Sequence, residues 1–363
     1  MIPPFMTSLP YRTRILTSLT TVAGAAVALG VLEIGLRLLA APDHIPRPRI
    51  LADSLHLPVV ARQQLEEGVG TAHYSTAGAR HTGNRPAGRD VTVVILGDSY
   101  VMAREVADHE TMGAQLERTA RANGFPLDVR QYGWSGASAA QYLVVSQAVL
   151  TRWHPRRVVV ALSENDLDLR ALTGDWPRLR VDAHGNSRVV GPPMDTVTAG
   201  PYASSLWMLT ERRWTTLRRS APSWARGPRG QGAPAADAPR DSTPPPDSSE
   251  IAALPAAVVR ALAKAYGQRL TLVYMAEIGL TSGFEPTAAE TRMLNTCKDA
   301  GVRCVSTRAD MLQARRQGII AHGVSTREIG SGHLNPRGHG VVAATMWKVL
   351  SADGALSDTV PRR

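Results

Sequence analysis

Four short polar segments of this chain carry side chains suited to acyl-transfer chemistry, and they follow one another in a defined order. Ser99 follows the apolar run VTVVIL at 91–96, Gly136 ends the segment GWSG, Asn165 lies in SEND, and His333 begins HLNPRGH. A serine hydroxyl is a weak nucleophile that a neighbouring imidazole activates. Amide donors stabilise the oxyanion that forms during the attack. The set predicts Ser99 as nucleophile and His333 as base, with the Ser99 amide, a glycine amide and a side-chain amide as oxyanion donors.

Each of these residues, taken alone, also has a purely structural explanation. A serine before a helix is commonly a cap, a glycine makes a turn, and an Asn-Asp pair forms an Asx turn. His333 and His339 are equally compatible with ordinary surface histidines. The order of the four segments, each placed after a strand or before a helix, is what favours a catalytic site.

The elements that must position these residues indicate an α/β fold. Helical and strand patterns alternate after residue 90, and continuous apolar runs of β-branched residues are typical of buried parallel strands. Ser99 then lies at the carboxyl end of a strand, where open α/β sheets bind ligands. The expected strands are 91–96, 127–132, 156–163, 269–276 and 302–306, and the expected helices are 111–123, 138–152, 251–266, 287–300 and one capped by Asn335.

The ordered segments resemble the motif blocks of the SGNH hydrolase superfamily, also called the GDSL esterase family. Gly97-Asp98-Ser99-Tyr100 is similar to the first block, Gly133 to Gly136 to the second, Ser163 to Asp166 to the third, and His333 to His339 to the last. The resemblance covers roughly residues 70–352. It implies a three-layer α/β/α sandwich around a mostly parallel five-stranded sheet, in a flavodoxin-like arrangement. It also implies that Ser99 is the nucleophile and His333 the base, and that Gly136 and Asn165 join the Ser99 amide in the oxyanion hole.

Two positions depart from the family pattern. The third block begins with Ser163 instead of glycine, which we treat as one small residue replacing another. The last block carries Gly330 where the family has the aspartate that supports the histidine, and the nearest upstream acid is Glu328. A Ser–His pair supported by a backbone carbonyl, an acid from elsewhere such as Glu328, and lost activity therefore all stay open.

The expected function is that of a serine esterase or deacylase acting on O-acyl groups of a carbohydrate or lipid. An O-acyltransferase for extracytoplasmic polysaccharide shares the same acyl-serine intermediate, and a non-catalytic binding protein on a decayed hydrolase fold is a further alternative. No cofactor is expected, and the sequence shows no cysteine-histidine cluster for a metal.

The charge of the chain bears on its binding partners, and its cysteine content bears on disulfide formation. The net charge is +10, with scattered arginines and no basic strip interleaved with aromatic residues, so nucleic acid is not an expected partner. Cys297 and Cys304 are the two cysteines, and we expect two buried thiols, although an oxidising compartment would allow them to pair.

The first 41 residues are expected to be a signal anchor, since residues 15–32 carry no charge. A signal peptide cleaved near Ala-Val-Ala at 26–28, or a buried soluble helix, are the alternatives. The rest divides into a connector at 42–90, a hydrolase domain at 91–352 with a disordered Pro-rich insertion at 221–250, and a tail at 353–363. The resemblance also suggests a membrane-anchored branch with an extracytoplasmic catalytic domain, periplasmic or at the cell surface, or secreted if the N-terminus is cleaved.

Overall fold

The structure is a computed structural model, and it describes the chain in segments. These segments are residues 11–39, 59–65, 68–75, 78–83, 91–173, 177–182, 184–191, 246–324, 329–352 and 356. Two compact units are distinguished, one formed by residues 1–42 with 198–238 and the other by residues 43–197 with 239–363. The candidate site residues all belong to the second unit.

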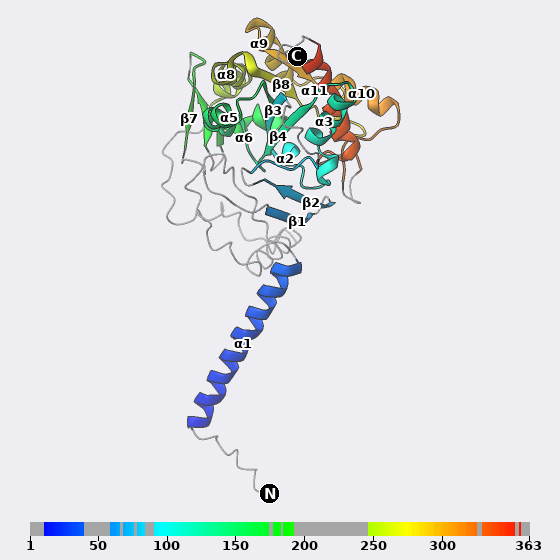
Figure 1. Cartoon of the computed structure of the whole chain (residues 1–363). Coiled ribbons are helices and arrows are strands. Elements are labelled where there is room, and N and C mark those ends of the chain that lie inside the picture. Colours follow the sequence, from blue (N-terminus) through cyan, green and yellow to red (C-terminus); the bar gives the residue numbers. More distant parts are fainter. Residues whose placement is uncertain are drawn as a thin grey trace. The chain divides into compact units, whose positions relative to one another are not determined.

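The second unit alternates strands and helices, as the sequence predicts (Figure 1). Its strands are β1 (Val59–Leu65), β2 (Gly68–Tyr74), β3 (Val91–Gly97), β4 (Leu127–Gly133), β5 (Arg157–Leu162), β6 (Arg178–Val181), β7 (Ser187–Val190), β8 (Leu270–Tyr274) and β9 (Arg303–Ser306). Its α-helices are α2 (Ser99–Met102), α3 (Met112–Ala122), α4 (Ala139–Val144), α5 (Ser146–Trp153), α6 (Leu169–Thr173), α8 (Ser248–Tyr266), α9 (Ala288–Asp299), α10 (Arg308–Arg316) and α11 (Pro336–Ser351). The 3-10 turns among its described residues are η2 (Asp108–Glu110), η3 (Glu164–Asp166) and η6 (Gly267–Arg269).

The central sheet has five strands in the order β4-β3-β5-β8-β9, and every neighbouring pair is parallel. Strands β3, β5 and β8 are apolar and almost entirely buried, as strands covered on both faces must be. The predicted five-stranded sheet with flanking helices is therefore confirmed. Because β4 and β5 flank β3, the loops after these three strands emerge at one end of the sheet.

Two groups of helices flank the sheet. Helices α3, α10 and α11 pack together, and helices α4, α5, α8 and α9 form the other group. Figure 1 shows the two groups on either side of the central strands. The N-terminus of α11 confirms the sequence prediction, because the Asn335 side chain accepts hydrogen bonds from the amides of Arg337 and Gly338, and Pro336 is the first helical residue.

Helix 138–152 of the sequence prediction is divided in the structure. It forms α4 and α5, which meet at Val145. The Ser146 hydroxyl donates to the carbonyl of Leu143, and such local side-chain bonds compete with the regular helical pattern.

Helix α8 begins earlier than predicted, so residues 248–250 are helical and not part of a disordered insertion. Asp247 caps the helix by accepting from the amide of Glu250. The Glu250 carboxylate is buried and accepts two hydrogen bonds from Arg180 and one from the Val181 amide on the β6–β7 hairpin. The rest of the predicted insertion, residues 221–245, lies outside the described residues, as does the tail at 353–363 apart from Leu356.

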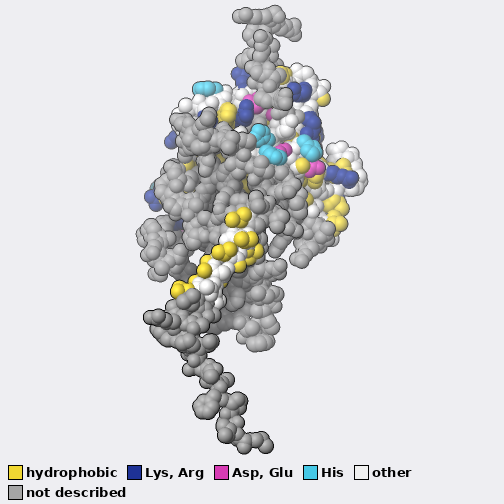
Figure 2. Space-filling view, turned by 60° about the horizontal axis from the view of Figure 1, so that its bottom comes forward, with side chains coloured by type: hydrophobic (Ala, Val, Ile, Leu, Met, Phe, Trp, Pro, Cys, Tyr) yellow, Lys and Arg dark blue, Asp and Glu magenta, His cyan; other side chains and the backbone are white. Residues whose placement is uncertain are grey.

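Helix α1 (Tyr11–Leu39) is the described part of the first unit. Its side chains from residue 18 to 32 are exposed, and Figure 2 shows hydrophobic ones along its length. Among the described residues, no helix combines the length and hydropathy needed to cross a bilayer, so the membrane-spanning anchor predicted here is not supported. The polar Thr17, Thr20 and Thr21 lower the hydropathy of the uncharged stretch.

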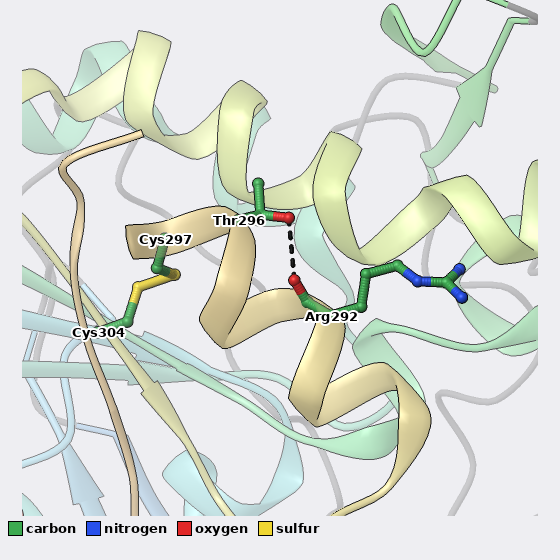
Figure 3. The surroundings of a disulfide bond; sticks show 4 residues. All are labelled: Arg292, Thr296, Cys297 and Cys304. Carbon is green, nitrogen blue, oxygen red and sulfur yellow. Dashed lines mark hydrogen bonds between the residues drawn. A yellow bond between two sulfur atoms is a disulfide. The ribbon is translucent and has the colours of Figure 1, made fainter. Parts of the chain in front are cut away.

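Cys297 and Cys304 form a disulfide, so the expectation of two free thiols is wrong (Figure 3). Cys297 lies near the end of α9 and Cys304 in β9, with Cα atoms 6.1 Å apart. The tight turn between them, in which the Val302 amide donates to the Cys297 carbonyl, brings the two residues within bonding reach.

We predict that this disulfide stabilises the second unit. Cross-linking a loop this short removes unfolded-state entropy equivalent to about 2 kcal/mol. Urea unfolding with and without reductant should show a loss of that order for the parent protein. A Cys297→Ala/Cys304→Ala variant should be as unstable as the reduced parent and insensitive to reductant. Equal stability of oxidised and reduced parent would contradict the prediction.

Candidate active site

Ser99 is the first residue of helix α2, directly beyond the end of β3. The Asp98 carboxylate caps this helix by accepting from the Tyr100 amide at 2.9 Å. Glycines end both β3 and β4 here because α2 lies against them. A Cβ on Gly97 would lie 2.9 Å from the Cβ of Val101, and one on Gly133 would lie 2.5 Å from the Cα of Met102. The local sequence therefore seats the serine close to the open end of the sheet.

His333 reaches Ser99 from the loop that precedes α11. Its Nε2 lies 2.9 Å from Ser99 Oγ, and its side chain is 26% exposed. The loop is held in place because the Gly323 amide donates to the His333 carbonyl and the Asn335 side chain donates to the Ile320 carbonyl. The structure thus brings together two predicted site residues that are far apart in the sequence.

The other ring nitrogen of His333 faces an acid that the sequence reasoning did not single out. Nδ1 lies 3.5 Å from Oε1 of Glu105, whose side chain is 4% exposed. Gly330, at the position where the family carries its aspartate, has φ +91°, and a Cβ there would lie 2.6 Å from Cγ of Leu280. Glu328, the candidate acid named from the sequence, lies outside the described residues.

The loop that carries Glu105 is braced by a buried arginine. The Arg80 guanidinium donates to the carbonyls of Met102, Ala103 and Val106 and to the Asp108 carboxylate. The Arg80 amide also donates to the Gln131 carbonyl on β4. Part of the segment predicted as a connector at 42–90 is therefore integral to the sheet edge and to the site.

Gly136 and Asn165 follow the ends of β4 and β5, the two strands that flank β3. Gly136 is exposed and has φ +72°, a conformation that glycine adopts without strain. Asn165 lies in the 3-10 turn η3 and is half-buried. Both predicted oxyanion residues therefore emerge at the same end of the sheet as Ser99.

Tyr100 and Trp134, which flank the motif residues, belong to the core. The Tyr100 hydroxyl donates to Glu277 Oε1 at 2.6 Å, and its ring lies 5.3 Å from that of His333. Trp134 is stacked between Tyr132 and Tyr142. Tyr100 therefore packs against His333, and Trp134 belongs to an aromatic stack of the core.

Beneath the site, two buried carboxyl groups meet at Ser163. The Ser163 hydroxyl donates to Asp98 at 2.8 Å, and its amide donates to Asp166 at 2.8 Å. Burial raises the pKa of Asp98 to about 6. Burial, and then the neighbouring Asp98, raise the pKa of Asp166 well above its ordinary value. Treating Ser163 as a neutral replacement for glycine is therefore wrong, since its hydroxyl joins this pair.

His339 of the last block lies in α11 and is buried. Burial, with the nearby positive charge of Arg80, lowers its pKa to about 3, so its imidazole stays neutral at physiological pH. Its burial makes it part of the core and not a surface histidine. Among the described residues, no three His, Cys, Asp or Glu side chains form a group able to hold a metal ion.

We predict that Ser163→Ala destabilises the protein by about 1–3 kcal/mol, because it removes a donor from a buried carboxylate. Urea unfolding measures this loss. Ser249→Ala is the matched control, since the Ser249 hydroxyl also donates to a carboxylate, Asp247, but at an exposed position. The control should change stability by less than about 0.5 kcal/mol. A Ser163 effect no larger than the control would contradict the role given to the hydroxyl.

A second prediction concerns pH. Between the ordinary histidine pKa of about 6.5 and the folded value of about 3, the unfolded chain binds a proton at His339 that the folded chain does not. Stability should therefore fall as the pH falls through this range, by up to about 1.4 kcal/mol per pH unit from this group. His339→Leu should reduce that slope in unfolding measured from pH 7 to 4. Asp98, whose raised pKa gives a slope of the opposite sign, is present in both proteins. Identical slopes would overturn the assignment.

Comparison with known proteins finds similar solved structures but no similar sequence. No family model matches the sequence, and no curated protein matches it at a significant level. Among similar solved structures is the psychrotrophic esterase EstA from Pseudoalteromonas sp., 14% identical, with 72% of this chain and 98% of that chain aligned and a TM-score of 0.38. A lipolytic G-D-S-L family protein from Veillonella parvula is 9% identical over 72% of this chain and 98% of that chain, with a TM-score of 0.36. The acetyl xylan esterase AlAXEase is 16% identical over 72% of this chain and 100% of that chain, with a TM-score of 0.39.

The motif blocks of the sequence have defined places in this fold. The first motif block follows β3, the second and third follow its two neighbours β4 and β5, and the last precedes α11. The blocks that resemble those of the SGNH hydrolase superfamily therefore lie at the carboxyl ends of neighbouring parallel strands and before the last helix.

Proposed function

We propose that this chain is a serine esterase or deacylase that acts on O-acyl groups of a carbohydrate or lipid. The observation that carries the proposal is the 2.9 Å contact between Ser99 Oγ and His333 Nε2. This distance is within hydrogen-bond reach, so the imidazole can remove the hydroxyl proton as the serine attacks. The substrate class follows from the family resemblance of the motif blocks.

The reaction divides into two acyl transfers. Ser99 Oγ attacks the ester carbonyl while His333 Nε2 takes its proton, and the carbonyl oxygen becomes an oxyanion. The tetrahedral intermediate then breaks the bond to the leaving alcohol, which receives the proton from His333, and an acyl-Ser99 remains. Water attacks this ester in the same way and restores the free serine.

The oxyanion donors in this proposal are the Ser99 amide, the Gly136 amide and the Asn165 side chain. Support comes from the sheet, because β4 and β5 flank β3 and all three residues follow the carboxyl ends of these strands. Gly136 is exposed at this end of the sheet and has a positive φ. Donors fixed by a rigid sheet need little reorganisation when charge develops on the substrate.

We also propose that the catalytic unit works outside the cytoplasm. The Cys297–Cys304 disulfide supports this location, because structural disulfides persist in oxidising compartments and are rare in the cytosol. The family resemblance of the motif blocks points the same way. Fractionation of cells that produce the full chain, with the disulfide state read by thiol labelling, tests the proposal.

The function is tested with p-nitrophenyl acetate and a fluorophosphonate probe. We expect the parent protein to hydrolyse the ester and to be labelled at Ser99. Ser99→Ala should abolish labelling, and Ser99→Ala and His333→Gln should each lower kcat by a factor on the order of 10⁴ or more. Ser146→Ala, at the start of α5, is the control and should retain parent activity. A folded parent that neither hydrolyses esters nor reacts with the probe would show the proposed function to be wrong.

A further inference from the structure

The histidine of the site has a buried carboxylate on its second nitrogen, and that carboxylate comes from an unexpected part of the chain. Glu105 is six positions beyond Ser99, in the loop between α2 and η2, whereas the family pattern places the supporting acid three positions before the histidine. Its Oε1 lies 3.5 Å from Nδ1 of His333, and Nε2 of the same ring lies 2.9 Å from Ser99 Oγ.

We propose that Glu105 is the positioning acid of the Ser99–His333 site. It takes the role of the family aspartate, whose position is occupied by Gly330 in this chain. The inference rests on the proposed function. In this role the carboxylate attracts the Nδ1 proton, which keeps Nε2 unprotonated toward Ser99. It also offsets the positive charge of the imidazolium that forms when Ser99 attacks.

The burial of Glu105 is a first argument for this role. Its side chain is 4% exposed, and a buried carboxylate is costly unless a charged or hydrogen-bonding partner compensates it. His333 is such a partner, and it is the residue whose charge changes during the reaction. In so dry an environment a single carboxylate acts on the imidazole more strongly than it would in water.

The backbone around Glu105 is a second argument. Arg80, with a side chain 1% exposed, donates to the carbonyls of Met102, Ala103 and Val106, which lie on both sides of Glu105. Ala103 has φ +51°, a left-handed conformation unusual for a residue with a Cβ. Such strain is retained where surrounding contacts impose it, and here it directs the chain so that Glu105 reaches the histidine.

The geometry at Gly330 is a third argument, because it removes the family alternative. Its φ of +91° favours glycine, and a Cβ would meet the Leu280 side chain at 2.6 Å. An aspartate at this position would require both the backbone and Leu280 to move. Position 330 is therefore shaped for glycine and not for the usual aspartate, and the carboxylate beside His333 comes from the α2–η2 loop.

The kinetic test compares Glu105→Gln with Glu110→Gln and Glu105→Asp. Glutamine has the shape of glutamate without its charge, so we expect Glu105→Gln to lower kcat by about 10²- to 10⁴-fold with KM changed less than about threefold. Glu110 lies in the adjoining turn η2, where it accepts from the Ala107 amide of the same loop, so Glu110→Gln tests loop structure alone and should stay within about threefold of the parent. Glu105→Asp, which keeps the charge, should recover at least tenfold of the lost kcat.

A spectroscopic readout separates the positioning role from a structural one and does not depend on activity. Spectra of ¹⁵N-histidine-labelled protein at pH 8 should show the proton of His333 on Nδ1 in the parent and in Glu105→Asp. In Glu105→Gln the same signal should shift toward the other tautomer or a mixture.

Three results would overturn the proposal: parent-like kcat in Glu105→Gln, an equal loss in Glu110→Gln, or an unchanged His333 tautomer in a folded Glu105→Gln protein. If Glu105→Gln does not fold, Glu105→Asp is the deciding variant. A His333 tautomer like that of the parent, with kcat at least one hundredth of the parent value, supports Glu105 as the positioning acid. Loss of the proton from Nδ1 of His333 in this variant refutes it. A parent without esterase activity would defeat the proposed function, while the tautomer measurement would still decide the role of Glu105.

Discussion

Helix α2 packs directly over the ends of β3 and β4, and this close approach is possible because both strands end in glycine. A side chain at Gly97 or Gly133 would collide with Val101 or with the backbone at Met102. The constraint places Ser99 at the edge of the sheet, next to the turns that follow β4 and β5. It also turns Asp98 inward, where its carboxylate caps the helix and meets Ser163. His333 contacts Ser99 at the start of this short helix, so the loop that carries His333 has to pack beside α2.

The residues that position the His333 imidazole come from distant parts of the chain. His333 belongs to the loop before α11, Glu105 to the loop after α2, and Arg80 to a segment that precedes the first central strand. Arg80 connects the α2–η2 loop to the edge of the sheet, because its guanidinium bonds to that loop while its backbone pairs with β4. The region before residue 91 is thus more than a connector, and its residues near Arg80 belong with the hydrolase domain.

The acidic residues of this site divide into two classes with different consequences. Glu105 lies within ion-pairing distance of an imidazole, whereas Asp98 and Asp166 are buried beside one another and share Ser163. Two carboxylates this deeply buried and this close cannot both ionise at small cost, which is why the pKa of each is raised. The pair stabilises the turn after β5 that carries Asn165, and so couples the cap of the Ser99 helix to the proposed oxyanion region.

Local pattern alone was enough to predict the alternation of strands and helices, the parallel sheet, and the caps of α9 and α11. Each of these depends on residues close together in sequence: apolar runs for β3, β5 and β8, Thr287 before Glu290, and Asn335 before Pro336. The motif order likewise located Ser99 and His333, because a serine after a buried strand and a histidine before a capped helix are local features. The pairing of Cys297 with Cys304 and the part of Ser163 could not be derived in this way, since distance and burial are set by packing. The acid beside His333 was beyond sequence reasoning for the same reason: Glu105 is distant from His333 along the chain, and only the folded loop, held by Arg80, brings its carboxylate to the imidazole.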